Sequence, residues 1–197
     1  MSLHWLTIYA VRSVAAQCSL ELILDKLHAY GRHNLASQIS YVDSAGINVG
    51  CSLTFPGDRP ANETMMQTIF GKYRRGNRVA QQMNDHSSRT LQPEDFYDFD
   101  VLVCVDNHIF NQVAAAMLAV QESELEARPS PLPPACYLTC LGWFIDEKGK
   151  KVGKDIPDPL RDSFKGEKTK MKECWRKTEK YMRCWLGDKF EWDVVNL

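Results

Sequence analysis

Four short apolar runs alternate along this chain with longer segments of helical periodicity, and this alternation constrains the fold more than any other feature. The runs cover residues 5–10, 39–44, 100–106 and 136–143. The third run, DVLVCVD, is apolar almost throughout, which is typical of a strand buried on both faces of a sheet. Strands that alternate with helices indicate βαβ units and a parallel sheet. We therefore predict an α/β fold, a single-domain doubly wound sheet of four parallel strands with about five helices on both faces.

The predicted helices follow from apolar residues at helical spacing. In the first helix, Leu20, Ile23, Leu24 and Leu27 share one face. The predicted bounds of the longer helices are residues 18–30, 62–70, 109–126 and 165–186. A short helix is expected after Gln92-Pro93-Glu94-Asp95, because proline favours the first helical position. The polar segment 73–88 is expected to be a loop or a weak helix.

Bulk composition places the chain among ordinary globular proteins. It has 197 residues, 44% of them hydrophobic and 25% charged, with a formal net charge of −1. This size suits one domain, and the charge gives no general reason to expect nucleic acid or an anionic membrane as a partner. The charge is uneven, since residues 148–189 have an excess of Lys and Arg and residues 93–126 carry only acidic charges. A charged partner could use this asymmetry, although solvated helix faces explain it more simply.

Targeting and cysteine patterns indicate a reducing intracellular setting. No apolar run approaches the ~20 residues of a membrane span, and the start of the chain does not look like a cleaved signal peptide. The seven cysteines are scattered, without a Cys-x-x-Cys pair or a zinc spacing. We therefore expect no metal and no cofactor, and a location in the cytoplasm or in an organelle matrix such as that of the mitochondrion.

Residues 11–17, VRSVAAQ, join the first predicted strand to the first predicted helix. Such a turn directs backbone N–H groups at whatever lies above it and is a natural anion site. Phosphate-binding turns are usually rich in glycine and carry a Lys, an Arg or a nucleophile. This turn has no glycine and a single basic residue, Arg12, whose side chain we expect to point to solvent.

Several strings in a fixed order resemble the low-molecular-weight protein tyrosine phosphatases. They are VDSAG at residues 42–46, DHSSRTLQPEDFYDFDVLVCVD at 85–106, LTCLGWFID at 138–146 and PDP at 157–159. The second string matches best: a His-x-x-Arg segment, a short helix with Asp-Phe, a Phe-Asp pair and an apolar strand that ends in Asp. The resemblance covers roughly residues 5–187. It implies a phosphatase-like domain at 1–187 with enlarged loops at 51–84, 121–135 and 146–157, and a C-terminal tail at 188–197.

The chemistry of this family needs three groups, and the resemblance implies that two are missing. A Cys thiolate attacks phosphorus, an Arg at the end of a Cys-x5-Arg loop grips the phosphate oxygens, and an Asp on an Asp-Pro loop protonates the leaving group. The nucleophile position falls on Ala10 and the arginine position on Ala16, whereas Asp158 matches the acid. Ala10 cannot form a phosphoenzyme, and Ala16 cannot stabilise the negative charge of the transition state. Asp158 without its nucleophile is more simply explained as a turn residue.

We therefore predict a pseudophosphatase: a catalytically inactive, soluble scaffold that acts as a binding, regulatory or accessory subunit of a larger assembly through protein–protein interaction. One alternative is a phosphate or phosphotyrosine reader that binds a small anion through the loop. Its candidate ligand-binding residues are Arg12, Ser13, Val14, Ala15, Ala16 and Gln17. Another alternative is a weak or altered phosphatase using Cys18, for which a structural role is the simpler interpretation. Nucleic-acid binding is disfavoured because no recognised module is present.

Overall fold

The computed structural model describes residues 2–8, 11–47, 67–71, 77–82, 89–127, 136–146, 148–156 and 167–194. Its elements, in chain order, are β1 (Leu3–Ile8), α1 (Val11–Ala29), α2 (His33–Ala36), β2 (Ile39–Gly46), α4 (Arg78–Gln82), β3 (Arg89–Thr90), α5 (Asp95–Asp98), β4 (Val101–Cys104), α6 (Asn107–Ala127), β5 (Tyr137–Cys140) and α7 (Glu167–Phe190). Residues 67–70 are also helical. The predicted helix start at Asn62 and the position Asp158 lie outside the described residues.

The sheet has five parallel strands in the order β3-β2-β1-β4-β5. The predicted doubly wound α/β fold is confirmed, with one strand more than expected. The additional strand, β3, pairs only with Ala45 and Gly46 and is too short to show a strand period in the sequence. The chain proceeds from β1 to β2 on one side and returns to β4 on the other. The winding therefore reverses between the carboxyl ends of β1 and β4, where sheets of this kind bind their ligands.

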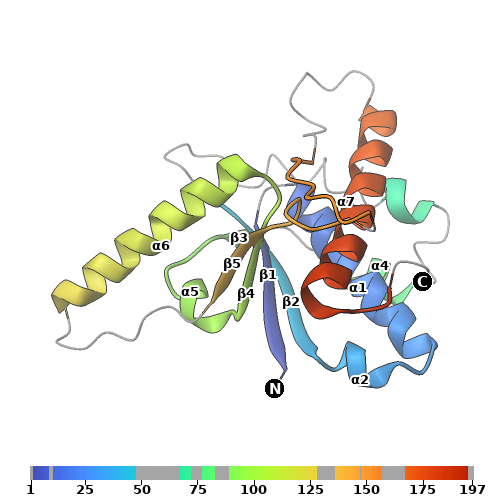
Figure 1. Ribbon diagram of the computed structural model, residues 1–197, viewed down its shortest axis with the longest axis horizontal. Helices are drawn as coiled ribbons and strands as arrows, with labels where there is room; N and C mark the ends of the chain where they lie inside the picture. Colours follow the sequence, from blue (N-terminus) through green and yellow to red (C-terminus); the bar gives the residue numbers. More distant parts are fainter. Residues whose placement is uncertain are drawn as a thin grey trace.

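Helices cover both faces of this sheet, as predicted. Figure 1 shows α1 and α7 on one side of the strands and α6, with the short α5, on the other. Alternate residues of a strand point to opposite faces, so each central strand contributes to two cores. Trp5 and Val103 belong to the core beneath α1 and α7, whereas Leu6 and Leu102 belong to the core beneath α5 and α6.

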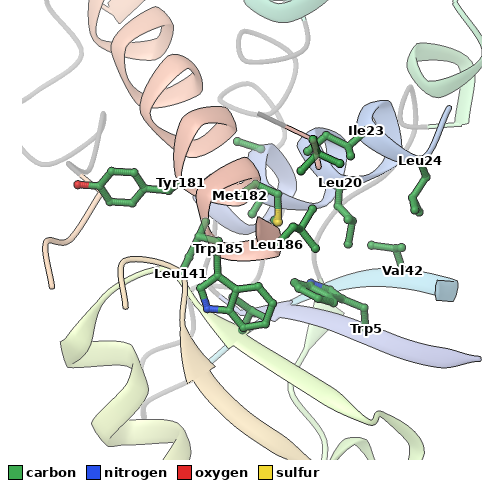
Figure 2. Close-up of a cluster of buried hydrophobic side chains, with 14 of the residues drawn as sticks. Trp5, Leu20, Ile23, Leu24, Val42, Leu141, Tyr181, Met182, Trp185 and Leu186 are labelled. Carbon is green, nitrogen blue, oxygen red and sulfur yellow. The ribbon is translucent and has the colours of Figure 1, made fainter. Parts of the chain in front are cut away.

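The larger core is built on the predicted apolar face of α1. Leu20, Ile23 and Leu27 are fully buried there, and each contributes roughly 1.5–3 kcal/mol through burial. Figure 2 shows Leu20 and Ile23 converging with the side chains of α7 above Trp5. Trp5 and Trp185 meet edge to face, with ring centroids 5.1 Å apart. The pairing of α1 with α7 thus holds the start of α1 firmly against the sheet.

The predicted boundary between domain and tail after Gly187 is not a structural boundary. Helix α7 continues to Phe190, and Trp192 and Val194 beyond it are buried in the same core. Glu191, with φ of 56°, turns the chain back toward the sheet. The burial of two apolar side chains explains why this segment packs against the domain.

One part of the segment 73–88, predicted to be a loop or weak helix, is the helix α4. Its residues Val79 and Ala80 are buried against Val14 and Cys18 of α1. Packing against α1 therefore stabilises a helix whose own sequence signal is weak. In the part of the chain that the structure describes, no helix combines the length and the hydrophobicity needed to cross a membrane.

Candidate functional site

The residues predicted to form a phosphate-type loop are helical. Helix α1 begins at Val11, so Arg12 to Gln17 make up its first two turns, and all six of these residues are buried. The predicted helix start at Cys18 was wrong. That prediction assigned residues 11–17 to a turn as long as the family's loop, whereas these residues belong to the helix. The segment has no glycine for a tight loop, and its alanines favour helix. Among the described residues the anion-binding turn is therefore replaced by helix.

Arg12 points into the protein and not to solvent, which corrects the expectation for this side chain. It is only 3% exposed, and its Nη2 donates to Oδ2 of Asp106 across 2.6 Å. Its Nη1 donates to the carbonyl oxygen of Ile156. Because a buried guanidinium needs charged and polar partners, these contacts explain its position. The side chain connects the start of α1 to Asp106 after β4 and to the backbone of Ile156.

Asp106 has two functions at the end of β4. It precedes the first residue of α6, and its Oδ1 accepts a hydrogen bond of 2.9 Å from the backbone N–H of Ile109. This is an N-cap contact, which satisfies one of the free N–H groups at a helix start. Its other carboxylate oxygen holds Arg12. One buried carboxylate thus fixes α6 and α1 against each other at the topological switch point.

Further hydrogen bonds join the chain segments around this pair. The hydroxyl of Thr7 donates to the carbonyl oxygen of Ser13 across 2.9 Å, which ties the end of β1 to the first turn of α1. The backbone N–H of Asn107 donates to Asp155 across 3.0 Å, and the indole N–H of Trp143 donates to Asn107 Oδ1 across 2.8 Å. These hydrogen bonds connect β1 to α1, and α6 to Trp143 and Asp155.

The cysteines near the start of α1 and the carboxyl ends of β4 and β5 are not activated as nucleophiles. Burial raises the pKa of the Cys18 thiol, and the charge of Glu21 raises it further. Burial also raises the pKa of Cys104, and it raises that of Cys140 to about 12. Because the thiolate is the nucleophile, these thiols are unreactive at neutral pH. Cys18 is fully buried in a cluster with Val79, as the structural interpretation requires.

The remaining predicted positions are placed only in part. Ala16 is fully buried in the core between α1 and the sheet. Gln17 is 5% exposed and donates through Nε2 to the carbonyl oxygen of Val42 across 3.3 Å. Ala10 and Asp158 lie outside the described residues. Among the described residues, no group of three or more His, Cys, Asp or Glu side chains is arranged to hold a metal ion.

A second charged cluster, which the sequence did not predict, joins β2, β3 and α5. The guanidinium of Arg89 donates to both oxygens of Asp95, each across 2.7 Å, and through Nε to Asp43 across 3.0 Å. Hydrogen bonding to Asp95 raises the pKa of Arg89. The fork geometry makes this a strong contact, and both carboxylates are engaged within the fold. We assign this cluster to the folding of the sheet edge.

Comparison with solved structures decides the fold family. The chain matches the arginine phosphatase of Drosophila with a TM-score of 0.55 and 20% identity, over 97% of this chain and 99% of that chain. It matches a protein tyrosine phosphatase from Entamoeba histolytica with a TM-score of 0.55 and 16% identity, over 99% of this chain and 100% of the other. The fold is that of the low-molecular-weight protein tyrosine phosphatases.

A third structure extends this likeness to a ligand-bound protein. Wzb from Vibrio vulnificus, solved in complex with benzylphosphonate, gives a TM-score of 0.52 at 18% identity, over 93% of this chain and 97% of that chain. At these identities the likeness concerns the phosphatase fold alone. Comparison with family profiles and with the sequences of curated proteins found no match.

Proposed function

We propose that this chain is a catalytically inactive phosphatase-like protein that acts as a binding, regulatory or structural subunit of a larger protein assembly. The observation that carries the proposal is the buried ion pair between Arg12 and Asp106. It lies at the carboxyl ends of β1 and β4, where a doubly wound sheet would bind its ligand. An arginine held by a carboxylate at this place does not present its positive charge to a phosphoryl group, which supports the proposal.

The chemistry of the aligned positions supports the same conclusion. Ala10 has no nucleophilic atom, and Ala16 has no guanidinium. The rate effects of removing groups that act together in catalysis are not additive, and losing the nucleophile alone can lower the rate about 10⁶-fold. The buried thiol of Cys18 offers no substitute, because its raised pKa keeps it protonated.

The ion pair also argues against a phosphate or phosphotyrosine reader. The positive charge of Arg12 is already matched by Asp106, and an incoming anion would meet that carboxylate. A reader would have to break a buried pair to release the guanidinium, at a cost of about 3–5 kcal/mol. Binding through surfaces away from the crevice therefore suits this scaffold better. We propose that it does so in a reducing intracellular compartment, the cytoplasm or an organelle matrix.

Hydrolysis of p-nitrophenyl phosphate by the purified chain tests the catalytic part of the proposal. We expect no release of p-nitrophenol above that of buffer, for the wild type and for Cys18→Ser alike. Steady turnover that Cys18→Ser abolishes would contradict inactivity.

Restoring the two missing groups by Ala10→Cys with Ala16→Arg tests the loop itself. We expect at most weak hydrolysis, because position 16 is fully buried in a helix and cannot present a guanidinium to a ligand. Substantial rescue would show that the segment can still form the family's loop. The single variant Ala10→Cys is the matched control, since it restores a thiol without disturbing the core position.

The assembly part of the proposal is tested by size exclusion of a native extract, with the chain detected by antibody. We expect it to elute well above the position of a free chain of 22.5 kDa. Elution of all of the protein as a free chain would contradict membership of a stable assembly.

A further inference from the structure

Residues 142–146 and 148–153 form an antiparallel hairpin after β5, with a single bridge between Ile145 and Lys151. The backbone N–H of Val152 donates to Phe144, and that of Asp146 donates to Lys150, each across 2.9 Å. At the base of the hairpin, a Cβ on Gly142 would lie 2.2 Å from the carbonyl oxygen of Lys154, so only glycine fits there. The hairpin is therefore held in one position by its own backbone and by close contact with the following segment.

Two aromatic side chains fix the hairpin to the rest of the domain. Phe144 is 4% exposed and packs edge to face on Tyr181 of α7, with ring centroids 5.2 Å apart. Trp143 packs on Phe110 of α6 at 4.5 Å, and its indole N–H bonds to Asn107. Rigid aromatic groups that are already oriented lose little entropy on binding a partner.

A groove of about 290 Å³ runs along this hairpin. Trp143, Phe144, Ile145, Val152 and Gly153 supply its apolar part, and Lys151 and Lys189 its charges. Trp143 remains 37% exposed and Ile145 47% exposed, although both are large apolar residues. Apolar side chains gathered in one recess mark a binding surface more clearly than single exposed ones do.

The charge around the groove is positive. Both charged side chains that line it are lysines, and the exposed Lys148, Lys150 and Lys154 lie on the same hairpin and the segment after it. Burial lowers the pKa of Lys177, and the charge of Lys154 lowers it further. Among the described residues, lysines therefore gather along this segment, beside the carboxylates of Asp155 and Glu173, which raise the pKa of Lys177.

Among the described residues of this segment, the carboxylates already accept hydrogen bonds or form ion pairs. Asp146 accepts hydrogen bonds from the backbone N–H groups of Lys148 and Lys150, and Asp155 accepts one from Asn107. Asp188 pairs with Lys189 at 2.8 Å, which leaves Lys151 as the lining lysine with no recorded carboxylate neighbour among the described residues.

We propose that this groove binds an acidic segment of a partner protein, with an apolar side chain inserted against Trp143 and Ile145 and a carboxylate placed on Lys151, while Lys189 adds to the positive charge of the lining. This inference rests on the proposed binding function and names the surface and the partner chemistry. The recessed shape favours a protein segment over an anionic membrane, because a flat lipid surface cannot enter a groove. Charge complementarity then sets the orientation of the bound segment.

Peptide titration of the full ¹⁵N-labelled chain tests the proposal. The probes are N-acetylated, C-amidated hexapeptides in which two central apolar residues are flanked by Asp or Glu. The readout is the indole N–H resonance of Trp143, assigned with the variant Trp143→Phe. We expect saturable shifts with the acidic peptides, and none when Lys replaces the acids or Ser replaces the apolar pair.

Charge reversals locate the site. Lys151→Glu and Lys189→Glu should each weaken binding by about tenfold or more, and added salt should weaken binding to the wild type. Lys172→Glu is the matched control: the same change at an exposed position of α7 outside the groove should leave the affinity unchanged. Unchanged amide spectra away from each substitution show that the variants are folded.

Four results would overturn the inference. They are silence of Trp143 at millimolar acidic peptide, equal binding of the basic peptides, equal loss in Lys172→Glu, and binding to phosphatidylserine vesicles in place of the peptides. Hydrolysis of an aryl phosphate would refute the proposed function but leave these peptide results standing. The failures of the two proposals are therefore distinguishable.

Discussion

Replacing Arg12 by Met should destabilise the protein by about 3–5 kcal/mol, because the change leaves the charge of Asp106 buried without its partner. The side chains of Arg12 and Asp106 are 4% and 11% exposed, so water cannot take the place of the lost partner. Met retains most of the apolar stem of Arg, which limits the loss of packing. The effect therefore measures the charge and its hydrogen bonds.

Asp106→Ser completes a double-mutant cycle. Serine still offers an oxygen to the N–H of Ile109, so the cap of α6 is kept while Arg12 loses its counter-charge. We again expect a loss of about 3–5 kcal/mol. The double variant buries no charge and should lose only about 1–3 kcal/mol, mainly from the carbonyl of Ile156. The coupling energy should therefore be about 3 kcal/mol or more.

Urea unfolding followed by tryptophan fluorescence measures this cycle, since Trp5 and Trp185 are fully buried. The coupling should persist in 1 M salt, because a buried pair is poorly screened. The exposed pair of Arg32 and Asp193, at 3.5 Å, is the control, and Arg32→Met should cost less than about 1 kcal/mol. Additive losses at Arg12 and Asp106, within about 0.5 kcal/mol, would refute the buried pair.

Three further predictions concern the hairpin, the C-terminal segment and α1. Gly142→Ala should cost about 2 kcal/mol or more in thermal unfolding, because its Cβ would lie 2.2 Å from the carbonyl oxygen of Lys154. Gly187→Ala is the control, because it lies within α7 and creates no such clash. An equal loss of stability in Gly187→Ala would contradict the packing at Gly142. Trp192→Ala should cost about 3–5 kcal/mol in urea unfolding, because the side chain is 2% exposed, and a near-neutral effect would show that this segment is not part of the core. Burial raises the pKa of the Glu21 carboxyl above its ordinary value, so its ionisation disfavours the folded state and stability is lost as pH rises through the unfolded and then the folded pKa. Glu21→Gln should therefore be more stable than the wild type at pH 7 and no more stable below about pH 4, and a gain independent of pH would contradict this assignment.

The strands and the long helices could be predicted because burial imposes a period on the sequence. The apolar run that includes β4 and the stripe of Leu20, Ile23 and Leu27 on α1 indicated their positions without tertiary information. The strand β3 could not be predicted, since two residues show no period. Helix α4 gave only a weak signal, because its stability comes from packing on α1.

The candidate site was predicted in part. The error concerned the backbone of residues 11–17, which was expected to form a loop and is helical. The resemblance placed Ala10 and Ala16 at catalytic positions and implied a loop between them. The local sequence of Val14 to Gln17 favours helix, and this preference prevailed. The ion pair joins Arg12 to Asp106 across 94 positions of sequence, a distance that no local pattern spans. The sequence did offer one sign of this pair: Asp106 follows a buried strand, and Arg12 is the single basic residue after the neighbouring strand.

Residues 12–17 should be helical, buried and unaffected by phosphate. Backbone amide and ¹³Cα resonances of the full chain, recorded while inorganic phosphate and then phosphotyrosine are added to millimolar concentration, test this claim. We predict helical ¹³Cα shifts for Arg12 to Gln17 and no saturable amide shift with either ligand. Extended or loop-like ¹³Cα shifts, or saturable movement of these amides on adding phosphate, would show that the crevice is open and would contradict the account.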